Sequence, residues 1–442
     1  MKLHDRVKSD AALPRQAGAV VIGAGIIGIS TALELAERGI DVVVVEKGEV
    51  AAEQSSRNWG WCRQMGRDPR EIPLAVESLK LWRGMNARIG DETGFRQCGI
   101  VYLSETAEEL AKDEAWCDRH ARAHCLGTQM IGASGIAALV PGFAKQWAGA
   151  MHTPTDGRAE PFIAVPAMAR ALQRRGGKIY TQCAARGIET QAGRVHGVVT
   201  EHGAIKTDTV VLAGGYWSRR FLNNMGVRFP QLGVINTVMR TAPLDAGVDC
   251  TFSGGAFAVR KRMDGGFTIA HNHRSVADIT PASFKHFFDF LPALKVDWQG
   301  LRLRIGRRFV EEARLPRRWT LDGVSPFEIV RVLDPVPIAG ITDAAVRDLI
   351  TSNSAFAGLQ IIERWAGMID ATPDAVPVID RIEQQPGLFL ASGFSGHGFG
   401  IGPGAGKLMA ELVTGDVRCV DPAPFRHSRF LDGTRPRPTT GV

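Results

Sequence analysis

The chain has 442 residues, more than one hydrophobic core usually supports, so two domains are expected. Its net charge of +7 lies in short clusters that apolar and acidic residues interrupt, which favours solvated helix faces or an anionic-substrate pocket over nucleic-acid binding. Its seven cysteines stand singly, so neither a disulfide framework nor a zinc site is expected, and we predict no metal site. No apolar run could span a bilayer and the start lacks a signal-peptide core, so we predict a cytoplasmic protein with a disordered lead over residues 1–16.

The first predicted elements form a strand–turn–helix–strand unit. An apolar run over residues 19–22 predicts a buried strand, and the helical pattern that follows ends at Gly39, before a second strand over residues 41–45. The turn between strand and helix has three glycines in G-x-G-x-x-G spacing: Gly23, Gly25 and Gly28. This unit is typical of dinucleotide binding.

Each part of the unit has a role beside a phosphate-bearing cofactor. The first glycine makes the tight turn, the second lets a pyrophosphate approach the backbone, and the third lets the helix pack on the strand. Ile26 and Ile27 begin the helix, whose free N–H groups would face the phosphates. Glu46 would accept hydrogen bonds from ribose hydroxyls and repel a 2′-phosphate, which disfavours NADP.

Residues 47–73 have no periodicity, so we predict a long loop that lies along the cofactor. The alternative is an ordinary surface loop anchored by its tryptophans. Trp61 would form a wall of the substrate pocket, and Arg63 would place a charge near the cofactor. The residues of this loop that we expect to contact the cofactor are Lys47, Ser55, Ser56, Arg57, Asn58, Trp59 and Gly60.

The middle of the chain alternates between the two expected domains. Helices over 74–89 and 106–120 with a strand over 95–103 are assigned to the second domain, before a helix over 162–174 and a strand over 178–183 resume the first. Two short strands then lead to an apolar strand that ends in Ala-Gly-Gly, a second place where backbone can approach a cofactor. Together with the first motif it favours FAD over NAD. The cofactor-binding candidates here are Ala185, Ala213, Gly214, Gly215 and Trp217.

Residues 226–364 contain three stretches that look like neighbouring antiparallel strands, with a hairpin turn at 264–266. Such a sheet would form the floor of a substrate pocket. His271 and His273 share a strand face in this prediction, but no third ligand is visible.

A strand over residues 388–391 precedes a glycine-rich run and a helix that is predicted to begin near residue 405. We interpret the run as a tight backbone wrap around a flat ring, with the helix N-terminus able to stabilise negative charge on a reduced flavin. His397 would face the flavin or the substrate amine. The cofactor-binding candidates in the run are Gly393, Phe394, Gly396, Gly398 and Ile401.

On the segments 19–47, 178–217 and 365–414 the chain resembles the FAD-dependent amino-acid and amine oxidoreductases of the D-amino-acid-oxidase/glycine-oxidase superfamily. It is more closely similar to bacterial L-amino-acid deaminases. That similarity rests on LWRGMN (81–86) with IG (89–90), KIYT (178–181) with RGIET (186–190), and GAIKT (203–207) with VVLAGG (210–215). The resemblance implies oxidation of L-α-amino acids to 2-oxo acids and ammonia, with hydride transfer from Cα to flavin N5.

Three departures from these relatives refine the expectation. The chain lacks their N-terminal apolar helix, so O2 is the expected acceptor, giving H2O2. The carboxylate-binding arginine of glycine oxidases is absent from 367–370, and Arg260, before a D-G turn, takes the place of the deaminase arginine. Gly367 stands where sarcosine oxidases attach flavin to cysteine, so FAD is expected to be non-covalent.

Four other functions are compatible with these sequence features: a quinone-linked dehydrogenase, a secondary-amine oxidase, an NAD-dependent dehydrogenase and a non-catalytic flavin-binding module. The superfamily suggests a homodimer.

The predicted fold is α/β, with a Rossmann-like FAD-binding domain built from discontinuous segments and an antiparallel-sheet substrate-binding domain of α+β type. The first comprises residues 17–74, 155–225 and 365–420, the second comprises 75–154 and 226–364, and residues 421–442 form a tail.

Overall fold

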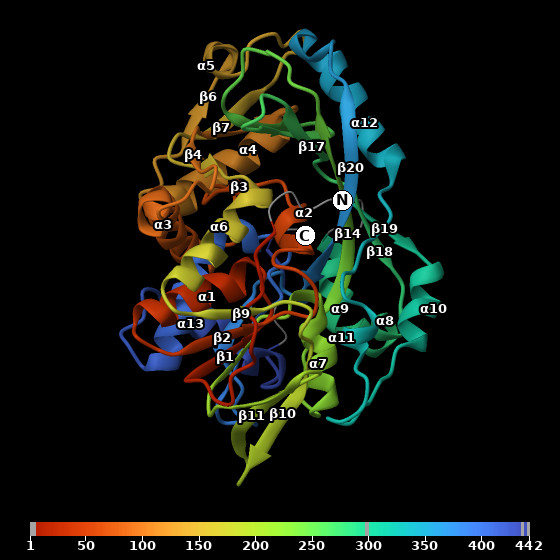
Figure 1. Cartoon of the computed structure of the whole chain (residues 1–442). Helices are drawn as coiled ribbons and strands as arrows, with labels where there is room; N and C mark the ends of the chain where they lie inside the picture. The colour runs from red at the N-terminus through yellow and green to blue at the C-terminus, as the bar shows by residue number, and fades with distance from the viewer. Residues whose placement is uncertain (1–5, 297–299, 435–436, 440–442) are drawn as a thin grey trace.

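Two large β-sheets organise the molecule (Figure 1). The computed structural model describes residues 6–296, 300–434 and 437–439. A six-stranded sheet lies in the lower half of Figure 1, near α1 and α13, and a ten-stranded sheet extends through the upper half. The predicted α/β fold with a Rossmann-like part and a mainly antiparallel part is confirmed.

The six-stranded sheet has the order β21-β22-β13-β1-β2-β9 and is parallel except where β21 meets β22. Its strands are β1 (Ala19–Ile22), β2 (Val42–Val45), β9 (Lys178–Tyr180), β13 (Val210–Leu212), β21 (Val378–Arg381) and β22 (Leu388–Ser392). Strands β1, β2 and β13 are apolar and fully buried, as expected for a parallel sheet covered on both faces.

Helices cover one face of this sheet: α1 (Ile26–Glu37), α3 (Ile72–Ile89), α6 (Pro161–Arg174) and α13 (Gly398–Thr414). The other face packs against α7 (Ser218–Asn224) and a small antiparallel sheet of β10 (Ala185–Gln191), β11 (Arg194–Thr200) and β12 (Gly203–Lys206). This small sheet has three strands, whereas the sequence predicted two short strands before β13.

The ten-stranded sheet has the order β19-β18-β14-β17-β16-β15-β5-β7-β6, and β20 pairs with β14 over ten positions. Its strands are β5 (Ile100–Ser104), β6 (Gln129–Ile131), β7 (Gly149–Thr153), β14 (Leu232–Thr241), β15 (Thr251–Gly254), β16 (Phe257–Lys261), β17 (Phe267–His271), β18 (Ser275–Asp278), β19 (Leu301–Arg304) and β20 (Ile361–Ala371). The three predicted antiparallel strands are β14, β16 and β17, and the turn at 264–266 closes the β16–β17 hairpin.

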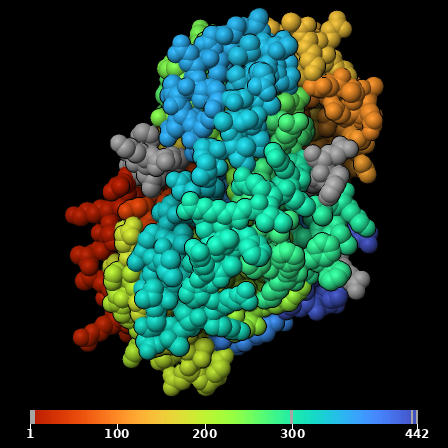
Figure 2. Space-filling view, turned by 90° about the vertical axis from the view of Figure 1, so that its right-hand side faces the viewer, coloured from red at the N-terminus to blue at the C-terminus, as the bar shows by residue number. Residues whose placement is uncertain are grey.

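The remaining elements connect and cover these sheets. A small sheet joins β3 (Trp61–Cys62), β8 (Gly157–Arg158) and β4 (Arg96–Gln97). The other helices are α2 (Gln54–Arg57), α4 (Ala107–Trp116), α5 (Ala133–Leu139), α8 (Pro281–Lys285), α9 (Phe287–Val296), α10 (Arg307–Arg314), α11 (Pro326–Ile329) and α12 (Ala339–Ser352). Figure 2 shows the teal segment that carries α8 to α11 covering much of the lower part of that face.

The glycine-rich run was interpreted wrongly as a loop up to residue 405. Helix α13 begins at Gly398, so most of the run is helical. The glycines are needed for close packing: a Cβ at Gly402 would lie 2.5 Å from Ile26 Cγ1, and one at Gly406 would lie 2.4 Å from Ser30 Cβ. Only the part before Gly398 is non-helical, and its predicted contact with a flat ring stays a prediction.

The predictions for the lead and for the long loop are also corrected. From Arg6 onward the lead packs along β9: Asp10 N donates to Ile179 O at 2.8 Å, and Val7 is 5% exposed. Residues 1–5 lie outside the described residues. The predicted loop over 47–73 contains α2 and β3, and α3 begins inside it at Ile72.

The predicted division into domains stays a prediction. Strand β20 crosses the boundary placed at residue 365, since its first residues belong to the segment 226–364. Two 3-10 turns, Ala423–Phe425 and His427–Phe430, pack the start of the predicted tail onto β21, and Phe425 is 1% exposed.

Candidate active site

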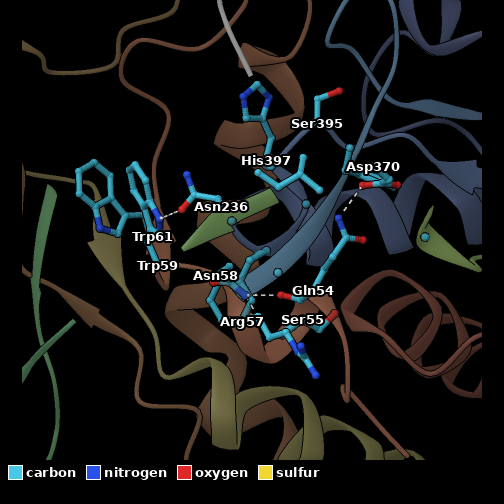
Figure 3. Close-up of a pocket in the computed structure, with 18 of the residues that line it drawn as sticks. Gln54, Ser55, Arg57, Asn58, Trp59, Trp61, Asn236, Asp370, Ser395 and His397 are labelled. Carbon is cyan, nitrogen blue, oxygen red and sulfur yellow. Dashed lines mark hydrogen bonds between the residues drawn. The ribbon is translucent and has the colours of Figure 1, made fainter. Parts of the chain in front are cut away.

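A large cavity of about 1450 Å³ lies where the two sheets meet. Its walls come from the β1–α1 turn, the segment 45–67, the end of β13 and the start of α13, and from β14, β17 and β18 of the large sheet. Figure 3 shows side chains of the segment 54–61, of Asn236 on β14 and of Ser395 and His397 arranged around a common space. The three segments predicted to hold a cofactor are therefore brought together.

The end of the cavity beside α1 fits the phosphate and ribose part of a dinucleotide. Gly25 caps α1 without a side chain, and Ser55 Oγ accepts a hydrogen bond from Ile26 N at 2.8 Å. Glu46 accepts hydrogen bonds from Ala24 N and from Gly48 N, each at 2.8 Å, which fixes its carboxylate at the cavity wall. Burial raises the pKa of Glu46 from its ordinary value.

Close backbone packing explains the outer glycines of the motif. A Cβ at Gly23 would lie 2.4 Å from Ala213 O, and one at Gly28 would lie 1.9 Å from Gly23 O. Gly28 therefore lets α1 approach β1 and does not line the cavity, whereas Gly25 does.

Polar contacts to the large sheet fix the segment around α2 (Figure 3). Gln54 Nε2 donates to Asp370 Oδ1 at 3.1 Å, and Trp59 Nε1 donates to Asn236 Oδ1 at 3.3 Å. Arg57 is buried and donates to Ala366 O at 3.0 Å. Sequence reasoning missed Gln54, Asn236 and Asp370. Of these three, only Gln54 could have been suspected from the sequence, because it directly precedes the predicted serine pair.

His397 lies at the N-cap of α13, on the cavity wall. Its Nδ1 is 2.9 Å from Glu71 Oε2, and Glu71 is fully buried. Burial, and then the positive charge of Arg67, lowers the pKa of His397 below its ordinary value. His397 is therefore expected to be neutral near pH 7.

Aromatic side chains and two arginines form the end of the cavity beyond His397. The rings of Trp59 and Trp61 meet edge to face with centroids 5.3 Å apart. Arg63 Cζ lies 5.4 Å from the centroid of the Tyr102 ring, and Arg63 Nη1 donates to Met65 O at 2.6 Å. Arg67, which sequence reasoning did not single out, also lines this end.

The structure places Arg260 off the cavity wall. Its guanidinium is 1% exposed and pairs with Glu160, with Nη1 2.8 Å from Oε1 and Nη2 3.2 Å from Oε2. Nη2 also donates to Thr268 Oγ1 at 3.0 Å. This placement does not favour the predicted role as a carboxylate clamp, because Glu160 already occupies both terminal nitrogens of the Arg260 guanidinium.

The other predicted residues fall into two groups. Those that line the cavity are Gly23, Gly25, Ile26, Ile27, Glu46, Lys47, Ser55, Arg57, Asn58, Trp59, Trp61, Arg63, Ala185, Ala213, Gly214, Gly215, Trp217, Phe394, Gly396, His397 and Gly398. Those that do not are Gly28, Ser56, Gly60, Arg260, Gly393 and Ile401. Lys47 is held by Glu53, with its Nζ 2.6 Å from Oε1, and His271 and His273 of the predicted pair both line the cavity.

Among the described residues, no group of three or more His, Cys, Asp or Glu side chains could hold a metal ion, and no helix is long and apolar enough to cross a membrane.

Comparison with known proteins identifies the family. The family described as FAD dependent oxidoreductase matches residues 19–412. The structure is similar to that of the L-amino acid deaminase from Proteus myxofaciens in complex with anthranilate, at 35% identity over 96% of each chain with a TM-score of 0.93. The L-amino acid deaminase from Proteus vulgaris is 33% identical over 95% of this chain and 99% of that chain, with a TM-score of 0.91. Glycine oxidase of Pseudomonas aeruginosa is 26% identical over 92% of this chain and 97% of its own length. The chain therefore belongs to the family of FAD-dependent oxidoreductases that includes amino-acid oxidases and deaminases.

Proposed function

We propose that the protein oxidises L-α-amino acids to 2-oxo acids and ammonia with non-covalent FAD. The observation that carries this proposal is the similarity to the two Proteus L-amino acid deaminases, which extends over nearly the whole chain at 35% and 33% identity. Similarity over a fold alone would not distinguish substrates. The cavity geometry adds a second support, since it joins a dinucleotide-binding end to a compact aromatic end.

The residues present fit FAD. The start of α1, where Gly25 has no side chain to block a close approach, would hold the pyrophosphate, Glu46 the ribose, and the segments at Gly214 and Gly396 the remainder. When bound, FAD supplies the two-electron acceptor for the hydride that leaves the substrate Cα. None of the described residues that line the cavity is a cysteine, so attachment of the flavin to cysteine has no candidate there.

The protein's own residues would bind, orient and dehydrate the substrate. Trp59 and Trp61 present apolar surface to the cavity, where expelled water strengthens polar contacts. His397, fixed by Glu71, would lie near the substrate amine without adding positive charge, which favours the neutral amine that the reaction requires. These roles are proposals.

We further propose O2 as the electron acceptor, with H2O2 as the product, and a homodimer as the assembly. A quinone-linked dehydrogenase and a secondary-amine oxidase share the fold and are the alternatives that the experiment must separate.

The test is an anaerobic visible spectrum of the purified protein before and after addition of L-phenylalanine, D-phenylalanine, sarcosine or L-proline. Bleaching of the flavin band by the L-amino acid alone is the expected result. Admission of air should restore the band with release of peroxide. Slow reoxidation by air with fast reoxidation by a quinone would favour the dehydrogenase, and bleaching only by sarcosine or L-proline would replace the substrate class.

A further inference from the structure

One charged group on the cavity wall has no role in the function proposed so far. Arg67 lines the cavity and is 3% exposed. Its guanidinium makes no hydrogen bond and no ion pair with any described residue, and its Nε and Nη1 are both buried. Because an unpaired buried charge is strongly unfavourable, an anion bound in the cavity would stabilise this guanidinium.

A second cation strengthens the positive potential at this place. Burial, and then the neighbouring Arg63, lowers the pKa of Arg67 to about 10, so Arg67 keeps its charge at neutral pH. Arg63 lies over the Tyr102 ring and donates one hydrogen bond to Met65 O, which neutralises none of its charge. The two guanidinium groups therefore share one end of the cavity.

The neighbouring carboxylates hydrogen-bond to other groups, although Glu71 Oε1 is buried without a partner. Glu71 bonds to His397, and Asp156 accepts hydrogen bonds from Gln64 N at 3.0 Å and Met65 N at 3.2 Å. Asp113, which also lines the cavity, is bonded by Ser104 Oγ at 2.9 Å. None of these carboxylates forms an ion pair with Arg67.

The arginine expected from the sequence is not available for the same task. Arg260 bonds both carboxylate oxygens of Glu160, and it does not line the cavity. Arg67 thus offers the open planar fork that bidentate carboxylate recognition needs.

We propose that Arg67, in the positive field of Arg63, binds the carboxylate of the substrate at the end of the cavity beside His397, and so restricts the enzyme to anionic substrates. The proposal rests on the proposed function for the identity of the substrate as an amino acid. The binding of a carboxylate can be tested without turnover.

The experiment measures calorimetric binding of benzoate and of its neutral analogue benzamide to the FAD-loaded protein. Arg67→Met is expected to weaken benzoate about 10- to 100-fold, the usual range for a hydrogen-bonded charge, and to change benzamide by less than about twofold. Arg67→Lys keeps the charge but not the fork, so an intermediate loss is expected. The control Arg119→Met removes one exposed arginine off the cavity and should leave both affinities unchanged.

Unchanged benzoate affinity in Arg67→Lys and Arg67→Met would overturn the proposal. Equal losses for benzoate and benzamide would do the same, since they would indicate altered shape and not lost charge. If Arg67→Met fails to fold, Arg67→Lys decides the question. Failure of the proposed function is seen separately, as wild-type flavin that no L-amino acid reduces although benzoate binds in an Arg67-dependent way.

Discussion

Buried ionic side chains in this protein are held by partners from distant parts of the chain. Arg260 on β16 and Glu160 before α6 are 100 residues apart, and their side chains are 1% and 7% exposed. Although burial alone would raise it, the Arg260 guanidinium holds the pKa of Glu160 below its ordinary value. The resemblance to the deaminases suggested Arg260 as a substrate clamp, and the sequence did not show that Glu160 would pair with it.

The pairing predicts a loss of stability in Arg260→Met. The substitution leaves the Glu160 carboxylate buried without its cation, so the free energy of unfolding should fall by about 3–5 kcal/mol. Thermal melting measures this. The double variant Arg260→Met/Glu160→Gln should recover much of the loss, and Arg96→Met, from the exposed pair with Glu92, should change little. If Arg260→Met keeps its stability but no longer binds benzoate, Arg260 binds the substrate carboxylate after all.

Asp156 predicts a specific pH dependence of stability. Burial raises the pKa of Asp156 to about 7, whereas the unfolded chain has a value near 4. The folded state therefore keeps a proton that the unfolded state releases, and the stability that this provides is full below about pH 4 and is lost as the pH rises through 7.

Since asparagine does not titrate, the stability of Asp156→Asn relative to wild type should improve by about 1.4 kcal/mol per pH unit between pH 5 and 7. Melting curves of both proteins across this range measure the effect, with the exposed Asp118→Asn as control. Parallel pH profiles of the variant and the wild type would contradict the assigned direction.

At the scale of elements, the spacing of glycines in α13 determines how three helices meet. Gly402 and Gly406 are four residues apart and face α1, while Gly404 contacts Leu74 and Ser78 of α3. Alternating glycines thus form two smooth faces on one helix. The low helix propensity of glycine led the sequence interpretation to a loop, because the tertiary packing that overrides propensity was not visible.

Alanine substitution in two helices should therefore have opposite effects. Gly406→Ala is expected to destabilise the protein by about 1–3 kcal/mol although it favours the helix, because its Cβ would lie 2.4 Å from Ser30 Cβ and 2.6 Å from Ser30 C. Gly84→Ala, within α3 and with no atom within 4 Å of the added Cβ, should stabilise by about 0.5–1 kcal/mol. Denaturant unfolding compares the two, and a stabilised Gly406→Ala would show that α13 can shift away from α1.

At the scale of the whole molecule, local patterns could be predicted and long-range pairings could not. The β1–α1–β2 unit and the β16–β17 hairpin depend on neighbours in sequence, and both were identified. The pairing of β14 with β20 joins strands 120 or more residues apart, and nothing in either stretch specifies the other. The cavity end at Arg67 was missed for the same reason, since its walls come from segments that only the folded chain brings together.

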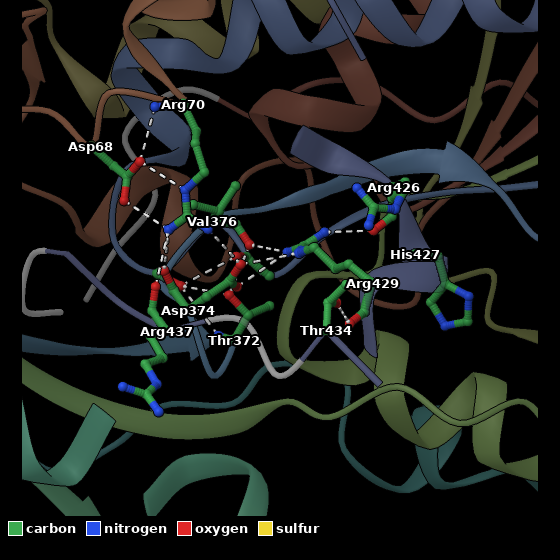
Figure 4. A network of polar contacts seen from close by, with 12 residues as sticks. Asp68, Arg70, Thr372, Asp374, Val376, Arg426, His427, Arg429, Thr434 and Arg437 are labelled. Atoms are coloured by element: carbon green, nitrogen blue, oxygen red, sulfur yellow. Dashed lines mark hydrogen bonds and ion pairs between the residues drawn. The ribbon is translucent and has the colours of Figure 1, made fainter. Parts of the chain in front are cut away.

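The C-terminal segment is a second long-range feature (Figure 4). Arg429 is 3% exposed, with its Nε 3.1 Å and its Nη2 3.2 Å from the two carboxylate oxygens of Asp374. Arg70 joins the same carboxylate at 3.1 Å and also pairs with Asp68. Thr439 donates to Asp68 as well, so this network fastens the predicted tail to the segment that follows Arg67.

Loss of Arg429 should therefore destabilise both segments that this network joins, the segment after Arg67 and the C-terminal segment. Arg429→Met leaves Asp374 fully buried with Arg70 as its remaining cation, and the free energy of unfolding is expected to fall by about 2–4 kcal/mol. Hydrogen exchange should rise in residues 66–72 as well as beyond residue 420, because the shared carboxylate holds both segments. Arg426→Met is the matched control: it lies in the same segment, its pair with Asp432 is exposed, and it should cost less than about 1 kcal/mol. Increased exchange confined to the C-terminal residues would show that Arg70 alone holds the segment after Arg67, and that the tail does not support the cavity.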